Sequence, residues 1–129
     1  MDDALLTLLR TVDTPTVCNA IETAQGQRGF SAFTRGTVLS SAPEAGAIVG
    51  YARTARITAQ SPSSDPADEV RTRRLGYYRH MSEGPRPAIA VVEDIDYPNA
   101  VGAYWGEVNT TVHKALGLAG ALPSTKEEL

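Results

Sequence analysis

Residues 101–120 read VGAYWGEVNTTVHKALGLAG, and they combine three patterns that follow one another closely. Gly102 and Gly106 bound a short aromatic segment and permit tight backbone turns. The next residues, from Glu107 to about residue 116, predict a helix, and the apolar run 118–122 predicts a strand. The stretch therefore predicts a loop, a helix and a strand in immediate succession.

A second apolar run precedes this stretch. Residues 88–92 read AIAVV and end at Glu93 and Asp94, which is typical of a short strand covered on both faces. The two runs and the helix between them predict a strand–helix–strand unit, in which ligands bind where strand ends meet helix N-termini. We therefore expect Glu93, Asp94 and residues 106–109 to lie near one edge of a sheet.

The N-terminal part predicts two short helices. Leucines recur at helical spacing from Leu5 to Leu9, and Asp2 and Asp3 suit the positive end of a helix dipole. Asp13 and Pro15 then predict the start of a second helix that ends near Gly26. The apolar side of this second helix is expected to be buried, and it carries Val17, Ala20 and Ile21.

The middle of the chain predicts a strand and a longer helix. Residues 46–57 form the best strand pattern, with one side formed by Tyr51, Arg53, Ala55 and Ile57. Residues 67–82 have helical character, with apolar positions at Val70, Leu75, Tyr78 and Met81. Glycine and prolines at 84–87 break this helix. The polar residues 123–129 predict a frayed end.

The totals indicate one globular α/β domain. The chain has 129 residues, of which 42% are hydrophobic and 21% charged, and its net charge is -3. This balance argues against nucleic acid as a partner, and the only basic cluster (Arg71, Arg73, Arg74) is interpreted as a solvated helix face rather than a phosphate site. No run is long enough to span a membrane. A single cysteine, Cys18, cannot form an intramolecular disulfide, which predicts a reduced, cytoplasmic setting.

The start of the predicted helix at Glu107 could bind a small anion. The first amides of a helix have no partners within it, so the N–H groups of Glu107, Val108 and Asn109 would face a ligand that the helix dipole also favours. In the alternative interpretation, Gly102 and Gly106 only shape a connection and Glu107 is an ordinary first-turn acid.

Residues 101–120 resemble the signature segment of the RraA-like family, which contains regulators of ribonuclease activity A and 4-hydroxy-4-methyl-2-oxoglutarate aldolases. Three upstream features occur in the order expected for that family: the opening helix pair, the Gly-x-Ala-x-Thr pattern at residues 50–54, and the apolar strand at 89–92. The resemblance therefore covers nearly the whole chain as one RraA-like domain.

This resemblance implies a swivelling β/β/α fold with two N-terminal helices and a C-terminal strand–helix–strand unit, assembled as a homotrimer or hexamer. It implies a lyase that uses Mg²⁺ or another divalent cation to cleave 4-hydroxy-4-methyl-2-oxoglutarate or to decarboxylate oxaloacetate through an enolate. The substrate, a small 2-oxoacid, would be held by Gly106, Glu107, Val108 and Asn109. Glu107 matches the acidic position implicated in orienting a water for proton transfer.

The end of the sequence departs from the family pattern. The family has an Arg-Asp pair after the last strand of this unit, in which the arginine binds substrate and the aspartate holds the metal through water. At that spacing this chain has Glu128 and Leu129, and residues 126–128 supply neither role, so no metal ligand is predicted. The expectation is a domain lacking the C-terminal part of the family domain. The alternative function is that of a non-catalytic regulator that binds a ribonuclease or helicase.

The histidines, the acidic residues after the 88–92 run and the aromatic pair at 104–105 are further candidates for chemical roles. His80 and His113 lack the short spacing of a zinc motif; His80 suits a helix C-terminus or packing, and His113 a subunit contact or solvent. Glu93, Asp94 and Asp96 could bind a cation, although a solvated acidic turn is the favoured interpretation. Tyr104 and Trp105 either wall a pocket or fill a core or interface.

Overall fold

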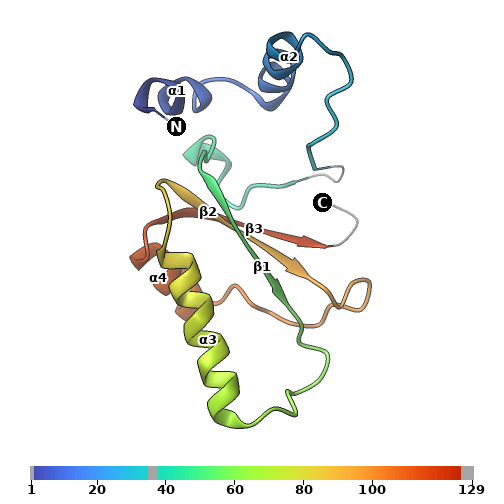
Figure 1. The fold of residues 1–129 in the computed structure, drawn as a ribbon, viewed down its shortest axis with the longest axis vertical. Coiled ribbons are helices and arrows are strands. Elements are labelled where there is room, and N and C mark those ends of the chain that lie inside the picture. Colours follow the sequence, from blue (N-terminus) through green and yellow to red (C-terminus); the bar gives the residue numbers. More distant parts are fainter. Residues whose placement is uncertain (1, 35–37, 126–129) are drawn as a thin grey trace. The chain divides into compact units, whose positions relative to one another are not determined.

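The structure of the chain, a computed structural model, describes residues 2–34 and 38–125 (Figure 1). These residues fall into two units, one within Met1–Val49 and the other within Gly50–Lys126. The first unit contains α1 (Asp3–Leu9), α2 (Thr14–Gln25) and a 3-10 turn, η1 (Pro43–Ala45). In the described part of the chain, no helix is both long enough and apolar enough to cross a membrane.

Both helices of the first unit have an aspartate as their N-cap residue. Asp2 accepts a hydrogen bond from the Leu5 amide at 2.7 Å, and Asp13 accepts one from the Thr16 amide at 2.8 Å. Gly26 ends α2 with a φ of 65°, a left-handed conformation that favours glycine. The prediction of two short helices is therefore confirmed, and the second starts after Asp13 and ends at Gly26 as expected.

The apolar side of α2 is less buried than the sequence predicts. Val17 and Ile21 are only half-buried, Ala20 is exposed, and no residue described in α2 is fully buried. Among the described residues of its unit, the other elements are the short α1 and η1, which are too small to enclose the apolar side of α2.

The second unit is a mixed α/β structure. Its parallel sheet has the order β1 (Tyr51–Ile57), β2 (Ala88–Asp94), β3 (Leu118–Thr125). The strands are joined by α3 (Ala67–Ser82) and α4 (Glu107–Ala115), as Figure 1 shows. The predicted strand–helix–strand arrangement at residues 88–122 is thus present. Another arrangement of the same kind, formed by β1, α3 and β2, precedes it.

One core joins the sheet to both helices. Met81, Ala88, Ala90, Val92 and Leu118 are buried, and the partly buried residues packed against them include Tyr77 of α3 and Trp105 and Leu116 on either side of α4. On β2, Ile89 and Val91 alternate with the buried residues and are half-buried. The prediction that this strand is covered on both faces is therefore correct for the face beneath the helices and only partly correct for the other.

The bounds of two predicted strands need correction. The first strand begins at Tyr51 rather than at residue 46, because Gly46 adopts a φ of 76° after η1 and leaves extended geometry. Within β1 the predicted alternation of burial is confirmed. The last strand runs to Thr125, which pairs with Asp94, so the predicted frayed end does not begin at residue 123. Residues 126–129 lie outside the described residues.

Arg86 ties the ends of the two helices together. Its Nη2 donates to the carbonyl oxygens of Met81 at 2.8 Å and of Leu116 at 3.0 Å. Positive charge is favourable at helix C-termini, where carbonyl groups lack partners within the helix. This one side chain therefore caps α3 and α4 and fixes their ends beside each other.

Candidate functional site

The start of α4 is an open helix terminus. Its N-cap, Gly106, is extended and contributes no side-chain cap, and a Cβ atom there would meet nothing within 4 Å. Glu107 and Val108 are exposed, and the Val108 side chain keeps 74% of its accessible surface. The first turn of α4 therefore lies at the surface, and its first amides have no partner within the helix.

Asn109, the fourth residue of the predicted binding segment, has a side chain that forms hydrogen bonds within the protein. Its Oδ1 accepts a hydrogen bond from the Tyr78 hydroxyl at 2.9 Å, and its Nδ2 donates to the Tyr104 carbonyl at 2.7 Å. The Gly106 amide donates to the same carbonyl at 3.2 Å. The side chain of Asn109 is thus engaged inside the protein, so this residue offers a ligand its backbone amide.

His113 lies one helical turn beyond Asn109 and is buried. Only 4% of it is exposed, which contradicts the expectation of a solvent or subunit position. Its Nδ1 lies 2.5 Å from the Asn109 carbonyl and its Nε2 lies 2.5 Å from the Tyr77 hydroxyl. A carbonyl oxygen only accepts, so Nδ1 carries a proton and donates to the Asn109 carbonyl, while Nε2 forms a hydrogen bond with the Tyr77 hydroxyl.

Four aromatic rings surround this histidine. The ring centroids of Trp105, Tyr77, Tyr78 and Tyr104 lie 5.0, 5.6, 6.3 and 6.4 Å from that of His113. Tyr104 and Trp105 are half-buried, and Trp105 packs against the core. Of the two interpretations of this aromatic pair, the structure supports core packing. We call these four rings with Asn109 and His113 the histidine cluster.

Burial in the histidine cluster raises the pKa of Tyr77 and of Tyr104, because a phenolate loses hydration there. The hydrogen bond with Tyr104 raises the pKa of Tyr77 further. The same hydrogen bond lowers the pKa of Tyr104, but burial is the larger effect there, so both protonated phenols remain favoured in the folded state. Both phenols are therefore protonated at physiological pH.

The stability of the chain is expected to fall above about pH 10, where tyrosines of the unfolded chain ionise. Because the folded-state pKa is raised, this stabilisation is complete below the unfolded value and is lost as pH rises toward the folded one. Urea unfolding between neutral and alkaline pH measures the effect. Tyr77→Phe should flatten the alkaline decline, and an unchanged decline in this variant would contradict the assignment.

Asp96, an acidic residue that follows β2, forms hydrogen bonds with the loop after β1. Asp96 accepts hydrogen bonds from the Thr58 hydroxyl at 2.6 Å and from the amides of Ala59 at 2.5 Å and Gln60 at 2.9 Å. The Ala59 amide and these other donors lower the pKa of Asp96. Asp96 therefore holds the loop that follows β1.

Glu93 and Asp94 are also engaged. Glu93 pairs with Arg56 at 2.9 Å, and Asp94 accepts from the Asp96 amide at 3.0 Å. Across residues 2–34 and 38–125, no three His, Cys, Asp or Glu side chains gather as a possible metal site. In the same residues no hydrogen bond or ion pair joins these acids to residues 106–109.

Gly102 marks a close approach between two loops at this end of the sheet. A Cβ atom on Gly102 would lie 2.6 Å from the Cβ of Ala59, closer than two carbon atoms can pack. Gly102→Ala is therefore expected to destabilise the chain by about 1–3 kcal/mol in urea unfolding. Combining it with Ala59→Gly should remove most of the loss, and equal losses in both backgrounds would show that the loops do not meet.

The basic residues of α3 lie at the surface. Arg71, Arg73 and Arg74 are exposed, and Arg73 pairs with Asp65 at 2.7 Å. The hydrogen bond from Arg73 lowers the pKa of Asp65. This arrangement matches the predicted solvated helix face.

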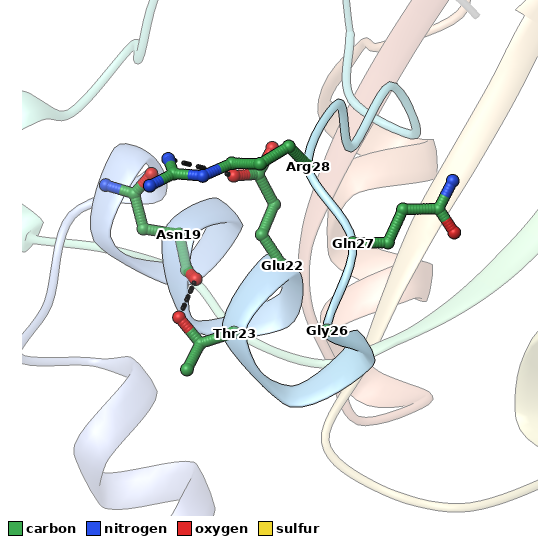
Figure 2. Close-up of a pocket in the computed structure, with 6 residues that line it drawn as sticks. All are labelled: Asn19, Glu22, Thr23, Gly26, Gln27 and Arg28. Carbon is green, nitrogen blue, oxygen red and sulfur yellow. Dashed lines mark hydrogen bonds and ion pairs between the residues drawn. The ribbon is translucent and has the colours of Figure 1, made fainter.

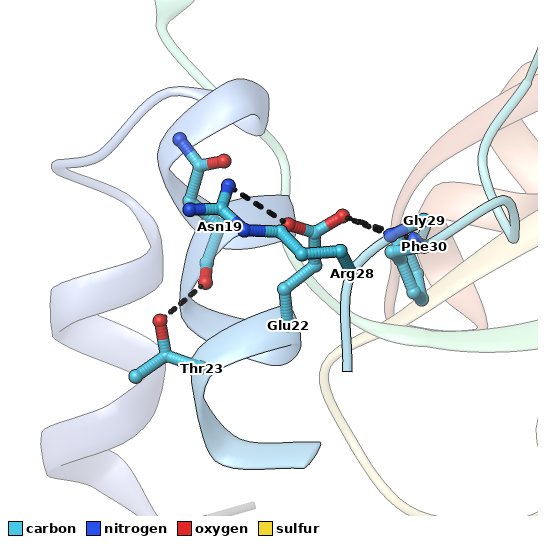
Figure 3. A network of polar contacts seen from close by, with 6 residues as sticks. All are labelled: Asn19, Glu22, Thr23, Arg28, Gly29 and Phe30. Atoms are coloured by element: carbon cyan, nitrogen blue, oxygen red, sulfur yellow. Dashed lines mark hydrogen bonds and ion pairs between the residues drawn. The ribbon is translucent and has the colours of Figure 1, made fainter. Parts of the chain in front are cut away.

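A hollow near the end of α2, in the first unit, was not predicted from the sequence. It has a volume of about 440 Å³ and is lined by Asn19, Glu22, Thr23, Gly26, Gln27 and Arg28 (Figure 2). Figure 3 shows the Glu22 carboxylate between Arg28 and the amides of Gly29 and Phe30, which donate to it at 2.8 and 3.0 Å. Glu22 thus stabilises the turn after α2, and none of the predicted site residues lies in this hollow.

Comparison with known proteins identifies no counterpart: no protein-family model, curated protein or solved structure matches this chain. What the chain does must therefore be inferred from its own residues and contacts, of which those at the start of α4 are the most informative.

Proposed function

We propose that the chain is a cytoplasmic RraA-like domain with the swivelling β/β/α fold, and that the start of α4 binds the carboxylate of a small 2-oxoacid. The exposed first turn at Gly106, Glu107 and Val108 is the observation that carries this proposal. Its amides would donate to carboxylate oxygens, and the helix dipole would add about 0.3–1 kcal/mol at an exposed site.

The proposed reaction is that of a lyase acting through a pyruvate enolate, on oxaloacetate or on 4-hydroxy-4-methyl-2-oxoglutarate. In oxaloacetate the bond between C3 and C4 breaks, CO₂ leaves, and the electron pair moves onto the 2-keto oxygen as an enolate. C3 then takes a proton to give pyruvate. The amides of α4 would stabilise the enolate oxygen, and the exposed Glu107 carboxylate would orient the water that supplies the proton.

The family resemblance also implies Mg²⁺ or another divalent cation, which would polarise the 2-keto oxygen. The described residues do not fit such an ion. Glu93 is paired with Arg56, Asp96 accepts three hydrogen bonds from the loop after β1, and Glu107 is the only acid in the first turn of α4. The steps proposed above therefore use only groups of the chain itself.

Release of pyruvate from oxaloacetate tests the proposal. With Mg²⁺ present, Glu107→Gln is expected to lower kcat about 100-fold through loss of proton transfer, whereas Glu69→Gln, at an exposed first-turn acid of α3, should leave it unchanged. EDTA separates cation-dependent from cation-independent turnover. Absence of turnover by the natural chain with and without Mg²⁺ would reject the lyase function, and full activity of Glu107→Gln would reject the role of Glu107.

The alternative function is a non-catalytic regulator that binds a ribonuclease or helicase. Two exposed valines near the start of α4 favour it: Val101 keeps 72% of its surface and Val108 keeps 74%. Such side chains suit a protein interface better than a 2-oxoacid. Titration with a purified ribonuclease would then give saturable binding that Val108→Ser weakens at least tenfold. Unchanged affinity in that variant would contradict this surface.

On the basis of the resemblance, we also propose that the chain assembles as a homotrimer or hexamer. Light scattering should then give three or six times the chain mass of 13.7 kDa. A monomer at micromolar concentration would contradict this assembly.

A further inference from the structure

The helices α3 and α4 lie side by side and run in the same direction, because each leads back from one strand of the parallel sheet to the start of the next. The Tyr78 hydroxyl donates to Asn109 at 2.9 Å, and the Tyr77 hydroxyl lies 2.5 Å from Nε2 of His113. Arg86 joins their C-terminal ends through one guanidinium nitrogen. The two helices are therefore aligned at their C-terminal ends.

The N-terminal part of α3 extends beyond the start of α4. With their C-terminal ends joined, the 16 residues of α3 and the 9 of α4 differ in length by about 10 Å at a helical rise of 1.5 Å per residue. Figure 1 shows α3 as the longer of the two helices. The extending part carries the basic residues of α3, which are Arg71, Arg73 and Arg74.

Arg74 lies on the side of α3 that faces the start of α4. It precedes Tyr77 and Tyr78 by three and four residues, so it shares their side of the helix one turn earlier. The ring of Tyr77 lies 5.9 Å from that of Tyr104, which comes just before α4. Burial raises the pKa of Tyr104, and the positive charge of Arg74 acts in the opposite direction. The charge of Arg74 therefore reaches the segment that leads into α4.

The guanidinium of Arg74 is free to bind a ligand. Its neighbour Arg73 is paired with Asp65 at 2.7 Å, whereas Arg74 is exposed and forms no hydrogen bond or ion pair with any residue that the structure describes. Glu107, the acid in the first turn of α4, is likewise not paired with it. A guanidinium offers several N–H donors in one plane, which suits a carboxylate.

We propose that Arg74 binds the second carboxylate of a ligand whose first carboxylate lies at the start of α4, an assignment that rests on the proposed function. The preferred ligand class is then a 2-oxo dicarboxylate. A monocarboxylate of the same length would leave Arg74 without a partner, so this residue distinguishes the two classes.

Two ligands of equal chain length test this preference. 2-Oxoglutarate and 2-oxopentanoate share the 2-oxoacid group, and they differ in ending with a carboxylate or a methyl group. In titrations followed by the amide resonances of Glu107 and Val108, 2-oxoglutarate is expected to bind about fivefold more tightly at low ionic strength, as for a favourable exposed ion pair. Added salt should reduce this preference. Equal affinities at low salt would overturn the proposal.

Two variants of equal charge change make the test specific. Arg74→Met keeps an apolar side chain and removes the charge, so it should lower the affinity for 2-oxoglutarate to that for 2-oxopentanoate and leave the latter unchanged. Arg73→Met alters the net charge equally at the arginine that is paired with Asp65, and should keep the preference. Equal losses in both variants would show a general effect of charge and overturn the role of Arg74.

The same titrations separate this proposal from the proposed function. Binding of both ligands at Glu107 and Val108 with equal affinity would retain the carboxylate site and overturn only the role of Arg74. If neither ligand shifts these amide resonances, the carboxylate site is rejected, and the role of Arg74 with it.

Discussion

Replacing Met81 by alanine is expected to lower the free energy of unfolding by about 2–5 kcal/mol. Met81 is fully buried and belongs to the cluster that joins α3 to β2 and β3. Truncation removes apolar surface from that cluster and leaves a cavity that the surrounding strands cannot close, because their ladder fixes their spacing. Urea unfolding monitored by the fluorescence of Trp105, the only tryptophan, measures the change.

The matched control is Leu75→Ala on the same helix. The sequence pattern grouped Leu75 with Met81 as an apolar position, but the structure leaves 56% of Leu75 exposed. The expected change is within about 0.5 kcal/mol. A loss as large as that of Met81→Ala would show that α3 presents a different face to the sheet.

Replacing His113 by leucine is expected to destabilise the chain by about 2–4 kcal/mol, although leucine is apolar and similar in size. The change removes the Nε2 partner of the Tyr77 hydroxyl and the Nδ1 donor to the Asn109 carbonyl. A half-buried phenol and a helix carbonyl would each lose a partner, at about 1–3 kcal/mol for a buried group. Burial of a leucine therefore does not offset the loss.

A double-mutant cycle with Tyr77→Phe isolates this interaction. Because phenylalanine has no hydroxyl to leave unpaired, His113→Leu should cost about 0.5–3 kcal/mol less in the Tyr77→Phe background. The control Tyr78→Phe removes a hydroxyl that bonds Asn109 instead of His113. Strict additivity of His113→Leu and Tyr77→Phe would contradict the hydrogen bond between the two side chains.

Local signals predicted most elements of this fold. Asp13, Pro15 and Gly26 act within a turn of the chain, and they mark the bounds of α2 well. The alternation along β1 and the breaker at residues 84–87 act over similarly short distances. The start of the first strand was misplaced because the left-handed φ of Gly46 is not visible in a run of small and β-branched residues.

The start of α4 was predicted from the same kind of signal, but its surroundings were not. The expectation of an exposed His113 missed its contact with Asn109, which lies four residues earlier on the same face of α4. Their partners, Tyr78 and Tyr77, come from α3 and are distant in sequence. The binding of Asp96 to the loop after β1 is likewise a contact between distant segments.

The parallel order of the three strands also bears on how the second unit folds. No two of these strands can pair as a hairpin, because a helix lies between β1 and β2 and another between β2 and β3. Each ladder can close only after a long excursion of the chain, which raises the loop entropy to be overcome and slows folding relative to helical proteins of this length. The central strand, β2, takes part in both closures, so we expect its pairing to limit the folding rate of this unit.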